Sequence, residues 1–241
     1  MASAATVELT EAPRNAYDRL NAARFDQAPV MRSGRPVGWV ETEALDRQEP
    51  VKSAMTALDD CTLISAESSI ASILPMIVQH KFLFVVGAGE VLGFIVKSDL
   101  DRHAVRSYLY LLIAGVEMQL SEIVQRSCED EVIVPKIDGR LKKMFKLAQD
   151  EGQEASPVQY LYLKPLIELF EEKARYDRNS LWNEELTARL HIIESFRNDV
   201  MHANKSLAAS PESVNIGNLP SCAAEVSEAL DRIINSLVPS T

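Results

Sequence analysis

The sequence predicts an α+β protein in which two β-α-β-β-α units are followed by an all-α bundle. Two patterns carry this prediction: a gapless internal repeat in the first hundred residues, and a change after Arg102 from strand-like runs to helical periodicity. Hydrophobic residues make up 46% and charged residues 25% of the 241-residue chain. This composition is typical of a protein with a full core, and it excludes a collagen-like or disordered chain.

The internal repeat relates residues 30–47 to residues 85–102 by a constant shift of 55 positions. The identical pairs are Val30/Val85, Gly34/Gly89, Gly38/Gly93, Leu45/Leu100, Asp46/Asp101 and Arg47/Arg102. The same shift aligns Leu9-Thr10 with Ile64-Ser65. We therefore interpret the first hundred residues as two copies of one structural unit.

The second copy illustrates the elements expected in both. Residues 62–65 are a short β-like run, and residues 68–79 carry apolar side chains at helical spacing, with Pro75 expected to bend or delay the helix. Residues 82–86 and 91–96 are two apolar strands, and the Gly-Ala-Gly-Glu segment between them is typical of a hairpin turn.

The transition to helix follows the second hairpin. Ser98 is expected to cap the next helix, with Asp99 and Asp101 in its first turn, where the helix dipole favours carboxylates. That helix is predicted to run to about Arg126. Its apolar stripe is Leu112, Val116, Leu120, Ile123 and Val124.

Four to five helices are predicted in the second half, which is typical of a bundle. After the first of them, the candidates are 136–147, 166–175, 184–200 and a last helix holding Ala224, Leu230, Ile233, Ile234 and Leu237. Ser156-Pro157 and Lys164-Pro165 are helix-start signals. The helix at 136–147 carries the clearest basic cluster of the chain, although a basic helix face is more often simply solvated.

Charge, cysteine content and hydropathy limit the function classes. The formal net charge is −10, so nucleic acid would have to be bound by a local surface rather than by bulk charge. The three cysteines are far apart, which favours reduced thiols over a metal site or disulfides. We read no signal peptide, and the longest apolar run, 108–116, is about half of a membrane span. We expect a cytoplasmic protein without a membrane segment.

The segment Gly93-Phe94-Ile95-Val96-Lys97-Ser98-Asp99 ends the second hairpin and starts the next helix. With the repeat, it resembles a tandem CBS (cystathionine β-synthase motif) pair covering residues 5–125. The resemblance implies an adenosine ligand such as AMP, ATP or S-adenosylmethionine. Asp99 would then bind the ribose hydroxyls, the helix start with Ser98 would offer N–H groups to phosphate, and Ile64 and Phe84 would flank the adenine.

The chain departs from the CBS pattern at three positions. Val96 stands where the family has Ser or Thr, and in the first copy Glu41 and Ala44 replace the hydroxyl and the acid. At most one nucleotide site is therefore expected. Two alternatives remain open: Asp99 is only an acid at a helix N-terminus, or the pair is a ligand-free scaffold for dimerisation.

The predicted helix at 184–200 is followed by a short polar motif. Arg197 and Asn198 precede His202, which gives an R-x4-H pattern. In an all-helical stretch, this pattern resembles HEPN domains (helical domains of prokaryotic and eukaryotic nucleotide-binding proteins) over residues 104–238. The resemblance implies a homodimer and a metal-independent ribonuclease, in which a ribose 2′-OH attacks the adjacent phosphate. His202 would transfer a proton, Arg197 would stabilise phosphoryl charge, and Asn198 would orient either group.

Helical geometry sets a test of this motif. At about 100° per residue, Arg197 and His202 diverge by about 140°, so a shared cleft needs the helix to fray or turn after Val200. Glu117 is costly to bury unpaired, and we hypothesise that it meets Arg197 across the bundle. In the alternative, Arg197 pairs with Glu194, and His202 is an exposed cation at the helix end.

Together these patterns predict a ligand-sensing effector. A CBS pair at 5–103, with copies at about 5–50 and 60–103, would regulate a toxin-like ribonuclease, a hydrolase of RNA, at 104–238. The alternative is a non-catalytic helical domain that dimerises or binds RNA or a partner protein. The low overall basicity favours this alternative, and the complete R-x4-H motif favours catalysis. No cofactor is expected to be required.

Overall fold

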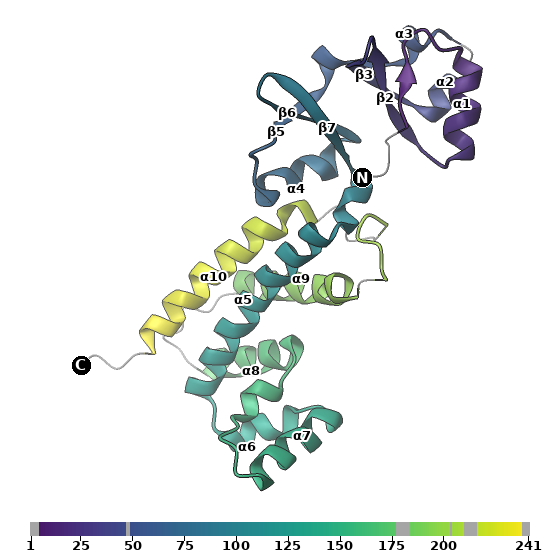
Figure 1. Cartoon of the computed structure of the whole chain (residues 1–241). Helices are drawn as coiled ribbons and strands as arrows, with labels where there is room; N and C mark the ends of the chain where they lie inside the picture. Colours follow the sequence, from purple (N-terminus) through teal and green to yellow (C-terminus); the bar gives the residue numbers. More distant parts are fainter. Residues whose placement is uncertain (1–4, 47–48, 177–183, 203, 210–215, 238–241) are drawn as a thin grey trace. The chain divides into compact units, whose positions relative to one another are not determined.

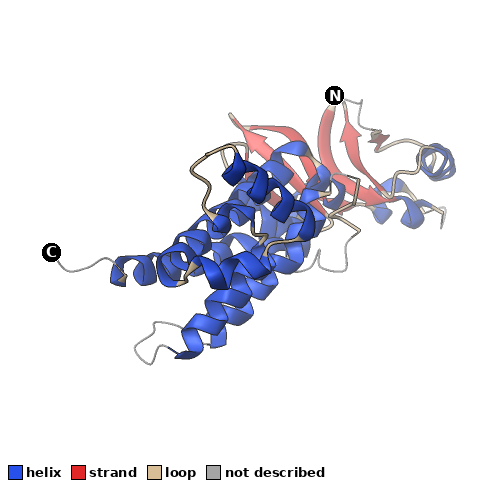
Figure 2. Ribbon diagram, turned by 90° about the horizontal axis from the view of Figure 1, so that it is seen from below, coloured by secondary structure: helices blue, strands red, loops and turns tan. Residues whose placement is uncertain are grey.

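The computed structural model describes residues 5–46, 49–176, 184–202, 204–209 and 216–237. The chain divides into two compact units, residues 1–97 and residues 98–241. The strands described lie in the first unit, and the second unit is built from helices and loops (Figures 1 and 2). The protein is thus of the predicted mixed α+β class.

The first unit contains two small sheets. Its elements are β1 (Val7–Glu8), α1 (Pro13–Ala22), β2 (Gln27–Arg32), β3 (Arg35–Glu41), α2 (Thr42–Leu45), α3 (Val51–Ala54), β4 (Thr56–Ala57), β5 (Thr62–Ser65), α4 (Ile70–Gln79), β6 (Phe82–Gly87) and β7 (Glu90–Val96). The sheet orders are β1-β2-β3-β4 and β5-β6-β7. In each copy the first strand pairs in parallel with the second, and a hairpin supplies the third strand.

The predicted repeat is confirmed in backbone detail. Both hairpin turns place two successive residues at positive φ: Ser33 (53°) and Gly34 (78°) in the first copy, and Ala88 (51°) and Gly89 (80°) in the second. Both hairpins also shift register at equivalent places, after Val30 and after Val85. Paired positive φ values give the turn a twist that matches the strands, which is why two unlike sequences fold into the same hairpin.

The first strand and first helix of the two copies are related by a different shift from the 55 positions that relate the rest of the repeat. Val7 pairs with Val30 as Ile64 pairs with Val85, so β1 and β5 are 57 positions apart, as are α1 and α4. The predicted alignment of Leu9-Thr10 with Ile64-Ser65 was therefore wrong. The loop between helix and second strand is two residues shorter in the second copy. Strand pairing and burial, with Val7 and Ile64 both in the core, decide the register.

Two local predictions in the second copy also need correction. The helix predicted from Ser68 begins at Ile70, because Ser69 caps it by accepting a hydrogen bond from the Ser72 amide at 3.2 Å. It runs through Pro75 to Gln79. The predicted cap at Ser98 was wrong, because residues 97–101 form a 3-10 turn and the following helix begins at His103.

The second unit is a helical assembly organised around one long helix. Its helices are α5 (His103–Ser127), α6 (Asp130–Ile133), α7 (Gly139–Asp150), α8 (Leu163–Tyr176), α9 (Glu184–Met201) and α10 (Leu219–Ser236). The long helix α5 packs against α8, α9 and α10 (Figure 1). The residues that α5 buries are Arg106, Leu109, Ile113, Val116, Leu120, Ile123 and Val124. These positions recur every three to four residues, so they form one face of the helix.

The helical predictions hold for most of this unit. The helix predicted at 184–200 is α9, which buries Leu186, Leu190, Ile193, Phe196 and Val200. The basic helix begins at Gly139 rather than at 136, because the Asp138 carboxylate accepts the Arg140 amide and caps it. The last helix, α10, holds Ala224, Leu230, Ile233 and Ile234 as predicted, with Leu230 buried and Ala224 exposed, but Leu237 lies just beyond its last residue, Ser236.

Candidate functional sites

A cavity of about 510 Å³ opens between the two copies in the first unit. Equivalent segments of the two copies line it: 25–27 and 80–81 at the starts of their second strands, and 41–43 and Lys97 after their third strands. The ends of α1 and α4 complete the wall. The cavity is therefore a product of the duplication, since neither copy alone encloses it.

Polar contacts connect the copies at this cavity. The Lys81 ammonium lies 2.7 Å from the Glu41 carboxylate, and the Gln27 side chain donates to the Lys81 carbonyl at 2.9 Å. The Lys81 pKa is raised by its hydrogen bond to Glu41 and by the charge of that carboxylate. Trp39 stacks on Phe82 of the other copy with ring centroids 5.4 Å apart. These contacts join the two copies beside the cavity.

The chemistry of the lining suits a polar ligand with an aromatic part. Arg24, Lys81 and Lys97 supply cations, while Tyr17 and Phe25 supply aromatic rings. Phe25 is 42% exposed, so its ring is accessible to solvent. Asp26, Glu41 and Glu43 balance the three cations. The volume lies within the range of small-molecule pockets, roughly 300–1,000 Å³.

The four predicted nucleotide-binding residues have different environments. Ile64 and Phe84 are buried in the core, at 4% and 1% exposure, so neither side chain presents a surface to a ligand in this conformation. Ser98 is exposed. Asp99 is half-buried and accepts a hydrogen bond from the Arg102 guanidinium at 2.9 Å. Sequence reasoning missed Phe25 and Lys97, whose signal was their place beside strand ends of a duplicated unit: Phe25 precedes β2, and Lys97 follows β7.

In the second unit, the end of α9 carries the R-x4-H residues. The Arg197 Nε donates to the Glu117 carboxylate on α5 at 3.1 Å, and the guanidinium lies 5.5 Å from the Tyr162 ring centroid. Both charged side chains are about four-fifths buried. The hypothesis that Glu117 meets Arg197 across the bundle is confirmed, and Glu117 rather than Glu194 is the ion-pair partner of Arg197.

The other two residues of the motif face solvent. Asn198 and His202 are exposed. The helix ends at Met201, so His202 is the first residue beyond it, although its amide still donates to the Asn198 carbonyl at 3.2 Å. The helix thus continues one residue past Val200, and the convergence of Arg197 and His202 on a shared cleft stays a prediction. Arg197 is held against α5 while Asn198 and His202 remain accessible.

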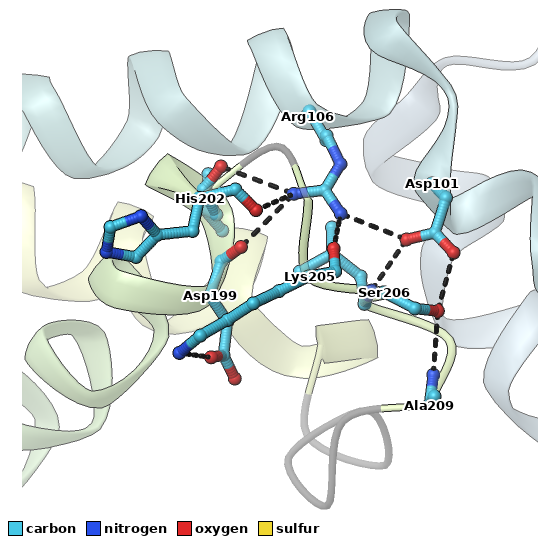
Figure 3. Close-up of polar contacts among 9 residues, drawn as sticks. Asp101, Arg106, Asp199, His202, Lys205, Ser206 and Ala209 are labelled. Atoms are coloured by element: carbon cyan, nitrogen blue, oxygen red, sulfur yellow. Dashed lines mark hydrogen bonds and ion pairs between the residues drawn. The ribbon is translucent and has the colours of Figure 1, made fainter.

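A buried arginine holds the segment that follows α9. Arg106 on α5 is 9% exposed and donates to the carbonyl oxygens of Asp199 at 3.1 Å, Val200 at 3.4 Å and His202 at 3.3 Å (Figure 3). It also donates to the Lys205 carbonyl. Sequence reasoning missed Arg106. Its signal was an arginine in phase with the buried stripe of α5, three residues before Leu109.

Asp101 pairs with Arg106 and extends this network. Its carboxylate lies 3.1 Å from the guanidinium, and it accepts the Ser206 hydroxyl at 2.7 Å and the Leu207 amide at 2.6 Å. Burial alone would raise the Asp101 pKa, but the hydrogen bonds from Ser206 and Leu207 and the charge of Arg106 outweigh it and lower the pKa. Asp101 is therefore an ionised anchor for the loop, not the helix N-terminal acid predicted from the sequence.

The remaining candidate chemistry is weak. Among the residues described, no group of three or more His, Cys, Asp or Glu side chains is arranged to hold a metal ion. Burial raises the pKa of the Cys61, Cys128 and Cys222 thiols, which makes them poor nucleophiles. Over the described part of the chain, no helix is long and apolar enough to cross a bilayer.

Comparison with solved structures finds that part of this chain is similar to proteins with CBS domains. No family model matches the sequence, and no curated protein matches it. Among solved structures, CBSX2 from Arabidopsis thaliana is 17% identical with a TM-score of 0.38, and the match covers 44% of this chain and 88% of CBSX2. CBSX2 in complex with AMP gives 16% identity, a TM-score of 0.39, and coverage of 44% and 90%. Staphylococcus aureus OpuCA is 15% identical with a TM-score of 0.35, covering 42% of this chain and 90% of OpuCA.

Proposed function

We propose that the first unit is a sensor that binds an adenosine ligand, in the manner of a CBS pair. The observation that carries the proposal is the cavity of about 510 Å³ between the two repeated copies. Phe25 offers an exposed ring on which a purine stacks, and Arg24 and Lys97 offer cations to a phosphate or carboxylate. Asp99 and Ser98 follow Lys97 in the chain, and we propose that they contact the ribose and phosphate.

Calorimetric titration with AMP, ATP and S-adenosylmethionine tests this sensor. We expect one of the three to bind. Lys97→Ala should weaken binding at least about 10-fold, because a charge-assisted hydrogen bond contributes about 1.5–3 kcal/mol. Phe25→Ala should weaken it similarly. Lys52→Ala and Leu63→Ala are the matched controls, since both residues are exposed in the first unit and outside the cavity lining. No heat with any ligand would favour a ligand-free scaffold.

We propose that the second unit is the effector, a HEPN-like domain that cleaves RNA without a metal ion as a homodimer. A specific observation favours this function: α9 ends at Met201, directly before His202, and a buried arginine donates to the carbonyls of Asp199 and His202. In the proposed reaction, His202 removes a proton from a ribose 2′-OH as the oxygen attacks the adjacent phosphate. The leaving 5′-oxygen takes up a proton, which gives a 2′,3′-cyclic phosphate, and Arg197 and Asn198 stabilise and orient the phosphoryl group.

Incubation with one defined RNA in the presence of a chelator tests the effector. The 2′,3′-cyclic phosphate product should form with the wild-type protein and fall at least 100-fold with His202→Ala. Arg197→Lys, which keeps the charge beside Glu117, should reduce cleavage while the protein stays folded. His191→Ala is the matched control, since His191 is an exposed histidine of the same helix that contacts Glu171. Equal cleavage by all variants would exclude the assignment, and RNA binding without cleavage would favour the non-catalytic alternative.

A further inference from the structure

Four carbonyl oxygens that belong to the end of α9 and to the loop behind it converge on one guanidinium. The last carbonyls of any α-helix have no partner within the helix, so they need donors from elsewhere. Arg106 provides them from α5, more than ninety residues earlier in the chain. A guanidinium has five N–H donors in a fixed plane, and it carries positive charge to the negative end of the helix dipole.

The ion pair with Asp101 compensates for the burial of the Arg106 charge. A buried cation without a partner would be costly, and Asp101 supplies the opposite charge to Arg106 at 3.1 Å. The same carboxylate accepts from Ser206 and from the Leu207 amide, so it fastens the loop to α5 through a second set of bonds. Arg106 therefore fixes the helix end, and Asp101 fixes both Arg106 and the loop.

Lys205 adds two contacts to this network on its solvent side. The Lys205 ammonium lies 3.1 Å from the Asp199 carboxylate, and the Lys205 amide donates to the His202 carbonyl at 3.0 Å. Figure 3 shows the backbone of His202 facing Arg106 while its imidazole points away from the guanidinium. The clamp, by which we mean Arg106 with Asp101, thus holds the main chain of His202 and leaves its ring accessible.

We infer that Arg106, oriented by Asp101, is a positioning residue that sets where the His202 imidazole stands relative to Arg197. The inference rests on the proposed RNA-cleaving function, for which it assigns two further residues. Arg106 touches no reacting atom. It acts through the carbonyls of Asp199, Val200 and His202, and a displacement of about 1 Å at a reacting group costs about 100-fold in rate.

The experiment compares Arg106→Lys, Ser206→Ala and Arg126→Gln with the wild-type full-length protein. Lysine keeps the charge that Asp101 requires but cannot donate in a planar fork to several carbonyls. Ser206→Ala removes one bond to Asp101 and is the milder variant, which covers the case in which Arg106→Lys fails to fold. Arg126 is the control, because it lies on the same helix and forms an ion pair with Glu122 on the surface.

We expect Arg106→Lys to lower kcat 10- to 100-fold with KM changed less than twofold, and Ser206→Ala to lower kcat about threefold. The imidazole resonances of His202 in NMR spectra should shift in both variants, whereas those of His191 should not. Arg126→Gln should match the wild type in every measurement. Wild-type kcat and unchanged His202 resonances in a folded Arg106→Lys protein would overturn the inference.

Amide hydrogen exchange separates this inference from the proposed function. If the wild-type protein cleaves no RNA, the proposed effector function fails by itself. The clamp is then judged by the His202 and Leu207 amides, whose exchange should rise at least 10-fold in Arg106→Lys and stay unchanged in Arg126→Gln. Unchanged exchange at both amides in Arg106→Lys would overturn the positioning role whatever the activity.

Discussion

Glu117 and Arg197 are 80 residues apart in sequence and meet in one ion pair inside the helical unit. Each side chain is only about one-fifth exposed, so each charge depends on the other for compensation. The Tyr162 ring adds a cation–π contact to the same guanidinium. Arg197 is therefore structurally restrained in the position from which we propose that it meets phosphate.

Removing the carboxylate tests how much this pair contributes. Glu117→Ala should destabilise the protein by about 1–2 kcal/mol, because it leaves a largely buried guanidinium without its anion. Urea denaturation measures the change. Glu122→Ala is the control, since its surface pair with Arg126 should contribute less than about 0.5 kcal/mol. Equal stability of the two variants would contradict the role assigned to Glu117.

Through Asp101, the free energy of unfolding of the helical unit is expected to depend on pH, and the surroundings of this carboxylate set the sign of the dependence. Its pKa is lower in the folded protein than in the unfolded chain, where it is about 3.9. Its stabilising contribution is therefore complete above that value and is lost as the pH falls through the lower folded pKa. The free energy of unfolding of Asp101→Asn should lie below that of the wild type at pH 7, and the gap should shrink below about pH 4. Asp59→Asn, at an exposed site in the first unit, is the control.

At the scale of elements, the two copies share hairpins but differ in their sheet edges. In the first copy β4 pairs with β3 opposite Gly38, and a Cβ built there would lie 2.1 Å from the Thr56 carbonyl oxygen. At the equivalent Gly93, a built Cβ would have no described atom outside its chain neighbours within 4 Å. The two glycines therefore occupy equivalent positions in different surroundings. Gly38 permits a fourth strand, β4, to approach closely, and Gly93 has no such neighbour among the described atoms.

The pair of glycines provides a matched test. Gly38→Ala should lower the free energy of unfolding by about 1–3 kcal/mol, because the obstruction is backbone and cannot rotate away. Gly93→Ala should change it by less than about 0.5 kcal/mol. Chemical denaturation of the two variants measures both values. If they are equal, the close contact between β3 and β4 is not what Gly38 accommodates.

For the whole molecule, a sensor that binds its ligand only when folded must be stabilised by it. At a ligand concentration 100 times the Kd, the stabilisation is about 2.7 kcal/mol. The melting temperature of the full chain, or of its first transition, should rise with that ligand. At the same concentration the stabilisation should fall to at most about 0.4 kcal/mol when Lys97→Ala and Phe25→Ala are combined, because binding is then at least about 100-fold weaker, and it should persist in Lys52→Ala. An equal rise in all variants would place the ligand outside the cavity.

Much of the local structure could be predicted because its signals are local. Helical spacing located α9, and alternating glycine and apolar residues located the β6–β7 hairpin. Contacts between residues that are far apart in sequence were harder to predict. The Glu117–Arg197 pair was predicted by asking what a costly carboxylate requires. The position of Arg106 in the buried stripe was visible in the sequence, but the main-chain carbonyls that it binds beyond α9 leave no trace in side-chain patterns.

The sequence by itself determined the duplication, the switch from strand to helix and the place of the R-x4-H residues, because backbone preferences and periodicity act over a few neighbours. Only the tertiary structure decided the 57-residue register of the first strands, the burial of Ile64 and Phe84, and the capture of the α9 end by Arg106. These outcomes depend on which residues, distant in sequence, come into contact in the folded protein. Burial and hydrogen-bond satisfaction select that arrangement, and they act on the folded chain as a whole.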